Sequence, residues 1–485
     1  MSERTVSDRR QPAGSTPQAD RRSSASPLRR RVVGCIALGT LLNPLNSSMI
    51  AVSLVRLHRD FDVGIATTEW LVSGFYLAAA VGQPLMGRLA DQFGARRVFC
   101  AGLGIVALTG ALAPLAPTFG WLIACRVLQA LGTSAAYPAG LLMIRGATTA
   151  APNAPPARRA LGVLAVANSV SAGVGPVLGG FLVSLASWPA IFLVNVAIVA
   201  VEWPMARRWL PRDITPAAGA RRDSRPSRWT AISAALSRLD LPGIALFSLA
   251  LAALFDLLLS LSGHVRWPLL VVVAAAGALF VGRERRARQP FLDVRMLVGN
   301  RPLMGVYVQF ALVNVAFYGV FFGVPLWLEQ VRGFDPGQAG LLMLPIAGCG
   351  VGASRVALRL ITRAGPRIAL IIGAATLTIA GLALLGLDAR TPVVDILLIG
   401  AVLGVPNGFN NLSLQAALYE HAPAPEAGAA AGLFQTFRYI GAILATSMLG
   451  LVFPLSATTH GLHVIAVAIA AIGAVLVVAS VRRVA

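Results

Sequence analysis

The feature that most constrains this chain is a series of apolar stretches, each long enough to cross a lipid bilayer as a helix. About 20 apolar residues in helical conformation span the hydrocarbon core. The 485-residue chain is 56% hydrophobic and 13% charged, with a mean hydropathy of +0.73, whereas soluble domains carry about 25% charged residues. The stretches are continuous rather than alternating and about twice as long as a barrel strand, which predicts membrane helices and excludes a β-barrel.

Fourteen such stretches are predicted to span the membrane, six in each half of the chain and two between the halves. They cover residues 32–55, 70–90, 98–116, 121–143, 161–184, 189–206, 241–261, 267–282, 302–326, 339–361, 367–387, 392–417, 429–455 and 460–481. The predicted domains are a disordered, Arg-rich cytoplasmic tail (1–31), an N-terminal six-helix bundle (32–206), a cytoplasmic linker (207–240), an inserted two-helix hairpin (241–282), a cytoplasmic connection (283–301) and a C-terminal six-helix bundle (302–481). The expected fold is therefore all-α and integral to the membrane.

The positive charge of the chain is distributed as a topology signal. The formal net charge is +21 and all 41 basic residues are arginine, a balance that could suggest a nucleic-acid partner. The arginines instead gather in polar connections on one side of the predicted spans, as the positive-inside rule describes. We therefore expect a multi-pass protein of the bacterial inner (plasma) membrane, with both termini cytoplasmic, the lipid bilayer as a partner and no nucleic-acid partner.

An internal repeat relates the two halves. The sequence GRLADQFGAR, from Gly87 to Arg96, recurs as LRLITRAGPR, from Leu358 to Arg367, and each copy follows the second span of a six-span half. Halves repeated in parallel about an axis along the membrane normal place a transport site near the midplane between them. The repeat therefore predicts a small-molecule transporter into which the central hairpin has been inserted.

The turn after the second span reads GRLADQFGARR, from Gly87 to Arg97. It resembles the loop signature of the major facilitator superfamily and lies where that family has it. The resemblance implies the major facilitator fold and a conformational latch made by Gly87, Asp91, Gly94, Arg96 and Arg97. Gly94 permits a tight turn, and Asp91 offers a carboxylate to a helix N-terminus or to an arginine. The alternative is a simple positively charged cytoplasmic turn.

Arg126 lies in the fourth span, at the start of RVLQALGTSAAYPAG. An arginine at a helix centre costs about 2.5 to 3.5 kcal/mol on insertion scales, so such residues usually have a function. The segment resembles the span 4 arginine motif of the superfamily, which implies a role in proton coupling. The alternative is an arginine that reaches the outer membrane interface.

The fifth span contains GVGPVLGG, from Gly173 to Gly180, which resembles the antiporter motif of drug:proton exporters. The motif residues are Gly173, Gly175, Pro176, Gly179 and Gly180. Small residues four apart allow close helix approach, and a proline bends the helix. The glycines of the tenth span, Gly348, Gly350 and Gly352, are a candidate partner surface, and generic glycine packing is the alternative.

Further similarity covers nearly the whole chain after residue 31, including WLVSGFYL from Trp70, WPAIFLVNV from Trp188 and GLFQTFRYIG from Gly432. With the central hairpin, these segments resemble the fourteen-span drug:proton antiporters, a multidrug efflux family associated with antibiotic resistance. Arg438 matches an arginine of that family, which implies a proton-coupling or cavity charge. A capping or packing role is the alternative.

The acidic residues depart from the family pattern. Such exporters commonly have an aspartate in span 1, where this chain has Asn43 and Asn46, and an amide cannot titrate. Asp256 of the hairpin is a candidate proton carrier, with ion pairing or lipid exposure as alternatives. Glu69 and Glu202 are interpreted as interfacial.

The expected function is export of small drug-like molecules by alternating access, coupled to proton influx. Candidate substrate-cavity residues are Asn43, Asn46, Gln129, Gln309, Asn314, Tyr318 and Asn410. The alternatives are a dedicated exporter of one metabolite or antibiotic, an uncoupled facilitator, and a non-transporting receptor or scaffold. A monomer is expected. No catalytic residue, cofactor or metal is expected, because the histidines and cysteines form no ligand set.

The predicted topology can be tested at Arg367. A reporter enzyme fused after this residue should be active on the cytoplasmic side, because only an even number of central spans keeps the arginines of the second half inside. A reporter that proves periplasmic would invert the second half and contradict the parallel repeat.

Overall fold

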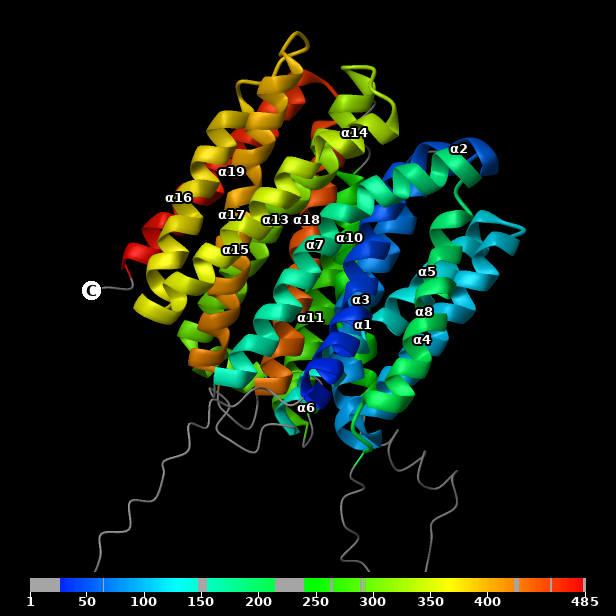
Figure 1. The fold of residues 1–485 in the computed structure, drawn as a ribbon, viewed down its shortest axis with the longest axis vertical. Helices are drawn as coiled ribbons and strands as arrows, with labels where there is room; N and C mark the ends of the chain where they lie inside the picture. Colours follow the sequence, from blue (N-terminus) through cyan, green and yellow to red (C-terminus); the bar gives the residue numbers. More distant parts are fainter. Residues whose placement is uncertain are drawn as a thin grey trace, which may run out of the picture.

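The computed structural model describes residues 27–63, 65–146, 155–213, 240–261, 265–287, 290, 292, 294–422, 427–453 and 456–482, and the described part is helical without a strand. The long helices run side by side along one direction, and the short helices α2 and α14 lie together at one end of the molecule (Figure 1). The predicted all-α fold is therefore confirmed.

Among the described residues, eight α-helices precede residue 213. They are α1 (Pro27–Met49), α2 (Leu54–Phe61), α3 (Ile65–Phe93), α4 (Ala95–Leu112), α5 (Phe119–Thr133), α6 (Ala136–Gly146), α7 (Pro155–Ala186) and α8 (Ala190–Trp209), with 3-10 turns η1 (Ile50–Ser53) and η2 (Ala113–Leu115). The central pair is α10 (Leu241–Ser260) and α11 (Pro268–Arg286).

The second half begins with the short helix α12 (Val294–Gly299). It continues through α13 (Arg301–Gln330), α14 (Pro336–Leu342), α15 (Leu344–Ala364), α16 (Pro366–Leu384), α17 (Val393–His421), α18 (Ala427–Val452) and α19 (Thr459–Arg482). A capping box starts α14, in which the side chain of Asp335 and that of Gln338 each accept a backbone hydrogen bond, so the N–H groups at the start of this helix have partners.

Ten helical segments of the described residues are long and apolar enough to cross a membrane. Helices α3, α7, α11 and α18 lie outside this set, although each is at least 19 residues long. The protein is thus a multi-pass membrane protein, whereas the number of fourteen spans and the orientation of the termini stay predictions.

The helices contact one another mainly within each half. In the first half α1 packs on α7 and α4 on α8, and in the second α15 packs on α17 and α16 on α19. Contacts between the halves run chiefly along α3 and α18, and along α7 and α15. The central helix α10 packs on α11 and also touches both α3 and α18, so it lies against the junction of the halves.

The glycines of the fifth and tenth spans do not pack against one another as the sequence suggested. A Cβ on Gly175 of α7 would collide with the side chain of Ser48 on α1, and a Cβ on Gly350 of α15 would lie 3.2 Å from the backbone oxygen of Gly404 on α17. A Cβ on Gly348 or Gly352 would meet nothing within 4 Å. The expected partner surface is wrong because the helix rotations direct Gly175 and Gly350 inward, within their own halves.

Gly404→Ala should destabilise the second half, because the added Cβ would collide with the backbone of Ile346. Overpacking of this kind costs about 1 to 3 kcal/mol, which should lower the melting temperature of the purified protein in detergent. Gly348→Ala, which meets open space, is the matched control. Equal melting temperatures for the two variants would contradict the close approach of α15 and α17.

Candidate functional site

Arg126 lies inside the first half, on α5, with 2% of its surface exposed. Its guanidinium donates to the side-chain oxygen of Gln129 at 2.7 Å and to the backbone oxygens of Asn46 at 3.3 Å and Leu71 at 3.5 Å. It also lies 4.3 Å from the ring centre of Phe75, a cation–π contact. The alternative of an arginine that reaches the outer interface does not fit this burial.

Asn46 takes part in a reciprocal amide pair with Asn195 of α8. The Nδ2 of Asn46 donates to Oδ1 of Asn195 at 2.6 Å, and the Nδ2 of Asn195 donates to Oδ1 of Asn46 at 2.9 Å. Both side chains are buried. Two buried amides that satisfy one another are held in place without any charge. Sequence reasoning missed Asn195, although it lies in the segment WPAIFLVNV, because the sequence does not show which residue of α1 it faces.

A small polar cavity lies between the halves. It is lined by Thr40, Asn43, Pro44, Gln83, Thr133, Tyr137, Gln435, Arg438 and Tyr439, from α1, α3, α5, α6 and α18. The predicted residues Asn43 and Arg438 thus share one cavity. Arg438 is the one charged side chain among these lining residues.

Neutral hydrogen bonds cross this junction. The hydroxyl of Tyr439 donates to Oδ1 of Asn43 at 2.7 Å, and the hydroxyl of Thr436 donates to the backbone oxygen of Ala80 at 2.9 Å. The Nε2 of Gln415 donates to the hydroxyl of Tyr137 at 2.6 Å. These bonds join the halves without ion pairs.

Aromatic rings surround Arg438 on the side of α13. Its Nε donates to the hydroxyl of Tyr318 at 3.3 Å, and the Tyr318 ring lies 5.3 Å from that of Tyr76 and 6.0 Å from that of Phe322. The Tyr76 ring is also 5.9 Å from the Tyr439 ring. Tyr318, predicted as a cavity residue, therefore joins the charge of Arg438 to an aromatic cluster.

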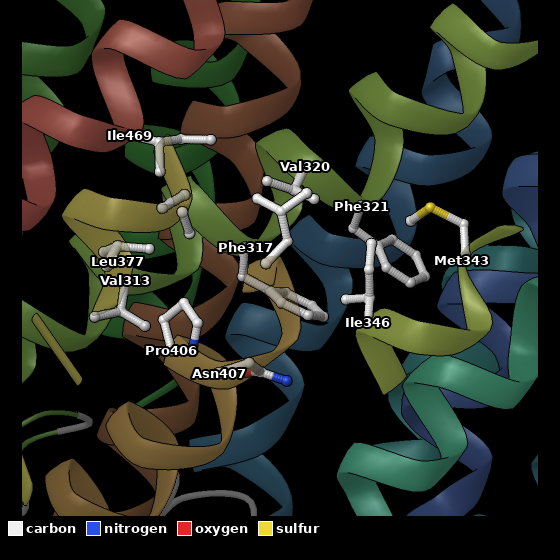
Figure 2. Close-up of a pocket in the computed structure, with 13 residues that line it drawn as sticks. Val313, Phe317, Val320, Phe321, Met343, Ile346, Leu377, Pro406, Asn407 and Ile469 are labelled. Carbon is white, nitrogen blue, oxygen red and sulfur yellow. The ribbon is translucent and has the colours of Figure 1, made fainter. Parts of the chain in front are cut away.

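A second small cavity, almost entirely apolar, lies within the second half. It is lined by Val313, Ala316, Phe317, Val320, Phe321, Met343, Ile346, Leu377, Ala380, Leu403, Pro406, Asn407 and Ile469. Figure 2 shows the rings of Phe317 and Phe321 beside Ile346, with Asn407 the polar side chain at the lower side of the space. Sequence reasoning missed this cavity because its apolar residues cannot be told from ordinary packing.

The other predicted polar residues of the second half, Gln309, Asn314 and Asn410, lie away from these two cavities. Asn410 donates to the backbone oxygen of Gly373 at 3.0 Å, and Asn314 donates to that of Phe310 on its own helix at 2.7 Å. Gln309 is buried. None of the three lines either of the two cavities.

Two acidic residues singled out in the sequence occupy different environments. Asp256 forms an ion pair with Arg266 at 2.6 Å, in accord with the pairing alternative. Glu202, interpreted from the sequence as interfacial, is fully buried on α8. That interpretation is wrong, because α8 turns this side chain toward α1 and α4.

The turn of the predicted latch is held by a residue outside the motif. Asp213, just after α8, accepts the backbone N–H of Arg96 at 2.8 Å and that of Arg97 at 3.1 Å. The Arg96 guanidinium donates to the backbone oxygen of Arg207. Gly94 has φ +100°, and a Cβ there would collide with the Asp213 carboxylate. Glycine is therefore required at this turn on two grounds.

The rest of the motif faces α6 and the inserted hairpin. A Cβ on Gly87 would lie at ordinary contact distance, 3.5 Å, from Pro138 of α6. Asp91 is exposed and interacts electrostatically with Arg88, which interacts in the same way with Asp240 and Glu284 beside the hairpin. The motif thus contacts the hairpin through charge.

The antiporter motif is described in part. Gly175 packs on α1. The backbone of Pro176 approaches α14, where a Cβ added to Gly340 would lie 3.3 Å from the backbone oxygen of Pro176. Gly179 and Gly180 are buried, and the surroundings of Gly173 lie outside the described part.

Together, the bundle of apolar helices and a polar cavity between its halves define a multi-pass membrane transporter. The model of the Major Facilitator Superfamily matches residues 36–446. The chain therefore belongs to this superfamily of transporters and not to a class of enzymes.

Relatives of known name agree with this family. The chain is 36% identical over 422 residues to the uncharacterized MFS-type transporter YwoD of Bacillus subtilis (strain 168), covering 86% of this chain and 89% of that protein. It is 31% identical over 429 residues to the puromycin resistance protein pur8 of Streptomyces alboniger, covering 86% and 80%. It is 28% identical over 428 residues to the tetracenomycin C resistance and export protein of Streptomyces glaucescens, covering 86% and 74%.

A solved structure supports the same fold. The nucleoside transporter NupG superposes with a TM-score of 0.58 at 14% identity, covering 94% of this chain and 99% of that chain. At this identity the likeness bears on the fold alone. The expected major facilitator fold is confirmed, and the drug-resistance relatives agree with the expected drug-exporter branch of the superfamily.

Asp213→Ala should lower the stability of the protein, because two N–H groups in the first turn of α4 lose their acceptor. Loss of a carboxylate that caps a helix costs about 0.5 to 2 kcal/mol, measurable as a lower melting temperature in detergent. Arg97→Ala is the control, since it keeps both backbone bonds and removes only an exposed ion pair at 3.9 Å. A larger effect of Arg97→Ala would contradict capping by Asp213.

Proposed function

We propose that this protein exports small drug-like molecules across the inner membrane by alternating access, in exchange for protons. The observation that carries the proposal is the polar cavity between the halves, bridged by Tyr439 and Asn43 and containing Arg438. A site shared by two packed halves can open to either side when they rock against each other. The names of the resistance and efflux relatives support export as the direction.

The cavity residues favour neutral or anionic substrates. The side chains that line the polar cavity offer amides, hydroxyls and one guanidinium, and no carboxylate is among them. A dication would meet no opposite charge there, whereas a carbonyl, phenol or carboxylate finds hydrogen-bond donors. The adjoining aromatic rings supply apolar surface for a ring system.

The predicted roles of the motifs belong to this proposal. The turn Gly87–Arg97 is the cytoplasmic latch, Arg126 and Arg438 are the charges that respond to proton binding, and the two six-helix units with the inserted hairpin are the moving parts. The capping of α4 by Asp213 supports a firmly held turn.

A dedicated exporter of one antibiotic is the second candidate. It is favoured by the names of the tetracenomycin C and puromycin relatives. A drug-susceptibility panel in an efflux-deficient bacterial host separates the two: resistance to several unrelated compounds indicates multidrug export, and resistance to one indicates a dedicated exporter.

Everted membrane vesicles test transport and its coupling. With an acidic interior, substrate should accumulate inside, because protons leaving the vesicle drive substrate in. For one proton per substrate, a gradient of one pH unit sustains about a tenfold accumulation. Gly175→Val should abolish accumulation while the protein is still inserted, since the side chain would force α7 away from Ser48. Equal accumulation with and without the gradient would remove proton antiport, and no movement at all would remove transport.

A further inference from the structure

The carboxyl group of Glu202 is the least compensated charge-bearing group among the described residues of the first half. The side chain is 0% exposed, and neither oxygen has a hydrogen-bond partner among the described residues. Its Oε1 lies 2.6 Å from the position that a Cβ on Gly39 of α1 would take. The ring of Phe99 on α4 lies against the same position. The missing side chain of Gly39 thus leaves the space that the carboxyl fills.

The described side chains that face this carboxyl are neutral. Cys35 of α1 and Cys100 of α4 are the titratable groups that interact with it. The charged groups Arg96, Arg207 and Asp213 interact with Cys100, nearer the latch turn. Helix α7 carries arginines only near its start, at 158 and 159, and α1 only near its start, at 29 to 31, where Arg31 lies 5.9 Å from the ring centre of Trp209. The turn η2 carries no titratable residue. A buried carboxylate without a cation or donors takes up a proton and becomes neutral.

The position of Glu202 links it to both the substrate cavity and the latch. The buried stripe of α8 includes Asn195 and, seven residues later, Glu202, so both face α1 about 10 Å apart along the helix. Asn195 pairs with Asn46 of α1, and Glu202 meets Gly39 of α1. Thr40, next to Gly39, lines the polar cavity. One helix, α1, therefore separates the carboxyl from the cavity.

On the other side, Glu202 lies close to the latch. Ala206 and Arg207 are the next residues one turn further along α8, and the backbone oxygen of Arg207 accepts the Arg96 guanidinium. Movement of α1 or of the latch turn would change the access of water to the carboxyl.

We propose that Glu202 is the proton-carrying carboxyl of this transporter. Buried as described here, it holds a proton; when α1 and the latch turn separate from α8, water reaches it and the carboxyl O–H transfers its proton to that water on the cytoplasmic side. The reloading proton comes from the periplasmic side in the opposite conformation. This inference rests on the proposed proton antiport, and it gives the chain a titratable group on the α1–α8 contact where Asn46 cannot serve.

Accumulation in everted vesicles, with and without a gradient of one pH unit, tests the assignment. Glu202→Gln reproduces the shape of the neutral acid and cannot release a proton, so the gradient-dependent ratio of accumulation should fall from about tenfold to about one. Substrate exchange without a gradient should persist. Glu202→Asp should keep part of the gradient dependence. Glu329→Gln, at a half-buried carboxyl near the end of α13, is the control and should behave as the wild type.

The outcomes separate the inference from the proposed function. If the wild type and Glu202→Gln respond equally to the gradient, the assignment is overturned and proton antiport stands. If the wild type ignores the gradient, both the antiport and the assignment fall. Should Glu202→Gln not assemble, infrared spectra of the purified wild type and Glu202→Asp decide: the band of a protonated buried carboxyl must shift between the two, and an unchanged band overturns the assignment.

Discussion

The hydrocarbon core of the membrane offers no hydrogen-bond partners, so each polar group inside this bundle depends on another part of the protein. Arg126 meets this constraint with neutral acceptors from α1, α3 and its own helix, together with the ring of Phe75. Its position therefore fixes how three helices pack. Asn46 takes part in two of these interactions. Its backbone oxygen accepts a hydrogen bond from Arg126, and its side chain pairs with that of Asn195.

The same constraint separates residues that hold the structure from residues that can respond to protons. The Asn46–Asn195 pair is complete in itself, and its hydrogen bonds do not change with pH. Asp256 is paired with Arg266. Glu202 lacks such compensation, and burial makes its charged form costly. Asp240 and Glu284 each have one buried oxygen without a hydrogen-bond partner, whereas Glu202 is the acid of the described residues in which both oxygens are buried and lack one.

The sequence could predict the helical class, the family and the residues whose chemistry is conspicuous in an apolar segment. Arg126 and Gln129 were recognisable because a charge or an amide inside a membrane span is energetically costly. The structure shows that the two side chains hydrogen-bond to each other. Asp213, Asn195 and Tyr439 were not, since their roles come from contacts between residues distant in the chain. Those contacts depend on helix rotation, which a single sequence leaves open, as the glycines of α15 also illustrate.

The strength of the contacts indicates where the molecule can move. Bonds between the halves, such as those of Tyr439 with Asn43 and Thr436 with Ala80, are neutral and contribute about 0.5 to 1.5 kcal/mol each. Within the second half, α15 and α17 approach so closely at Gly404 that separation would open a gap in dense packing. Rocking along α3 and α18 therefore costs less than deforming the second half. Because α10 touches both of those helices, the proposed rocking would require α10 to slide on at least one of them.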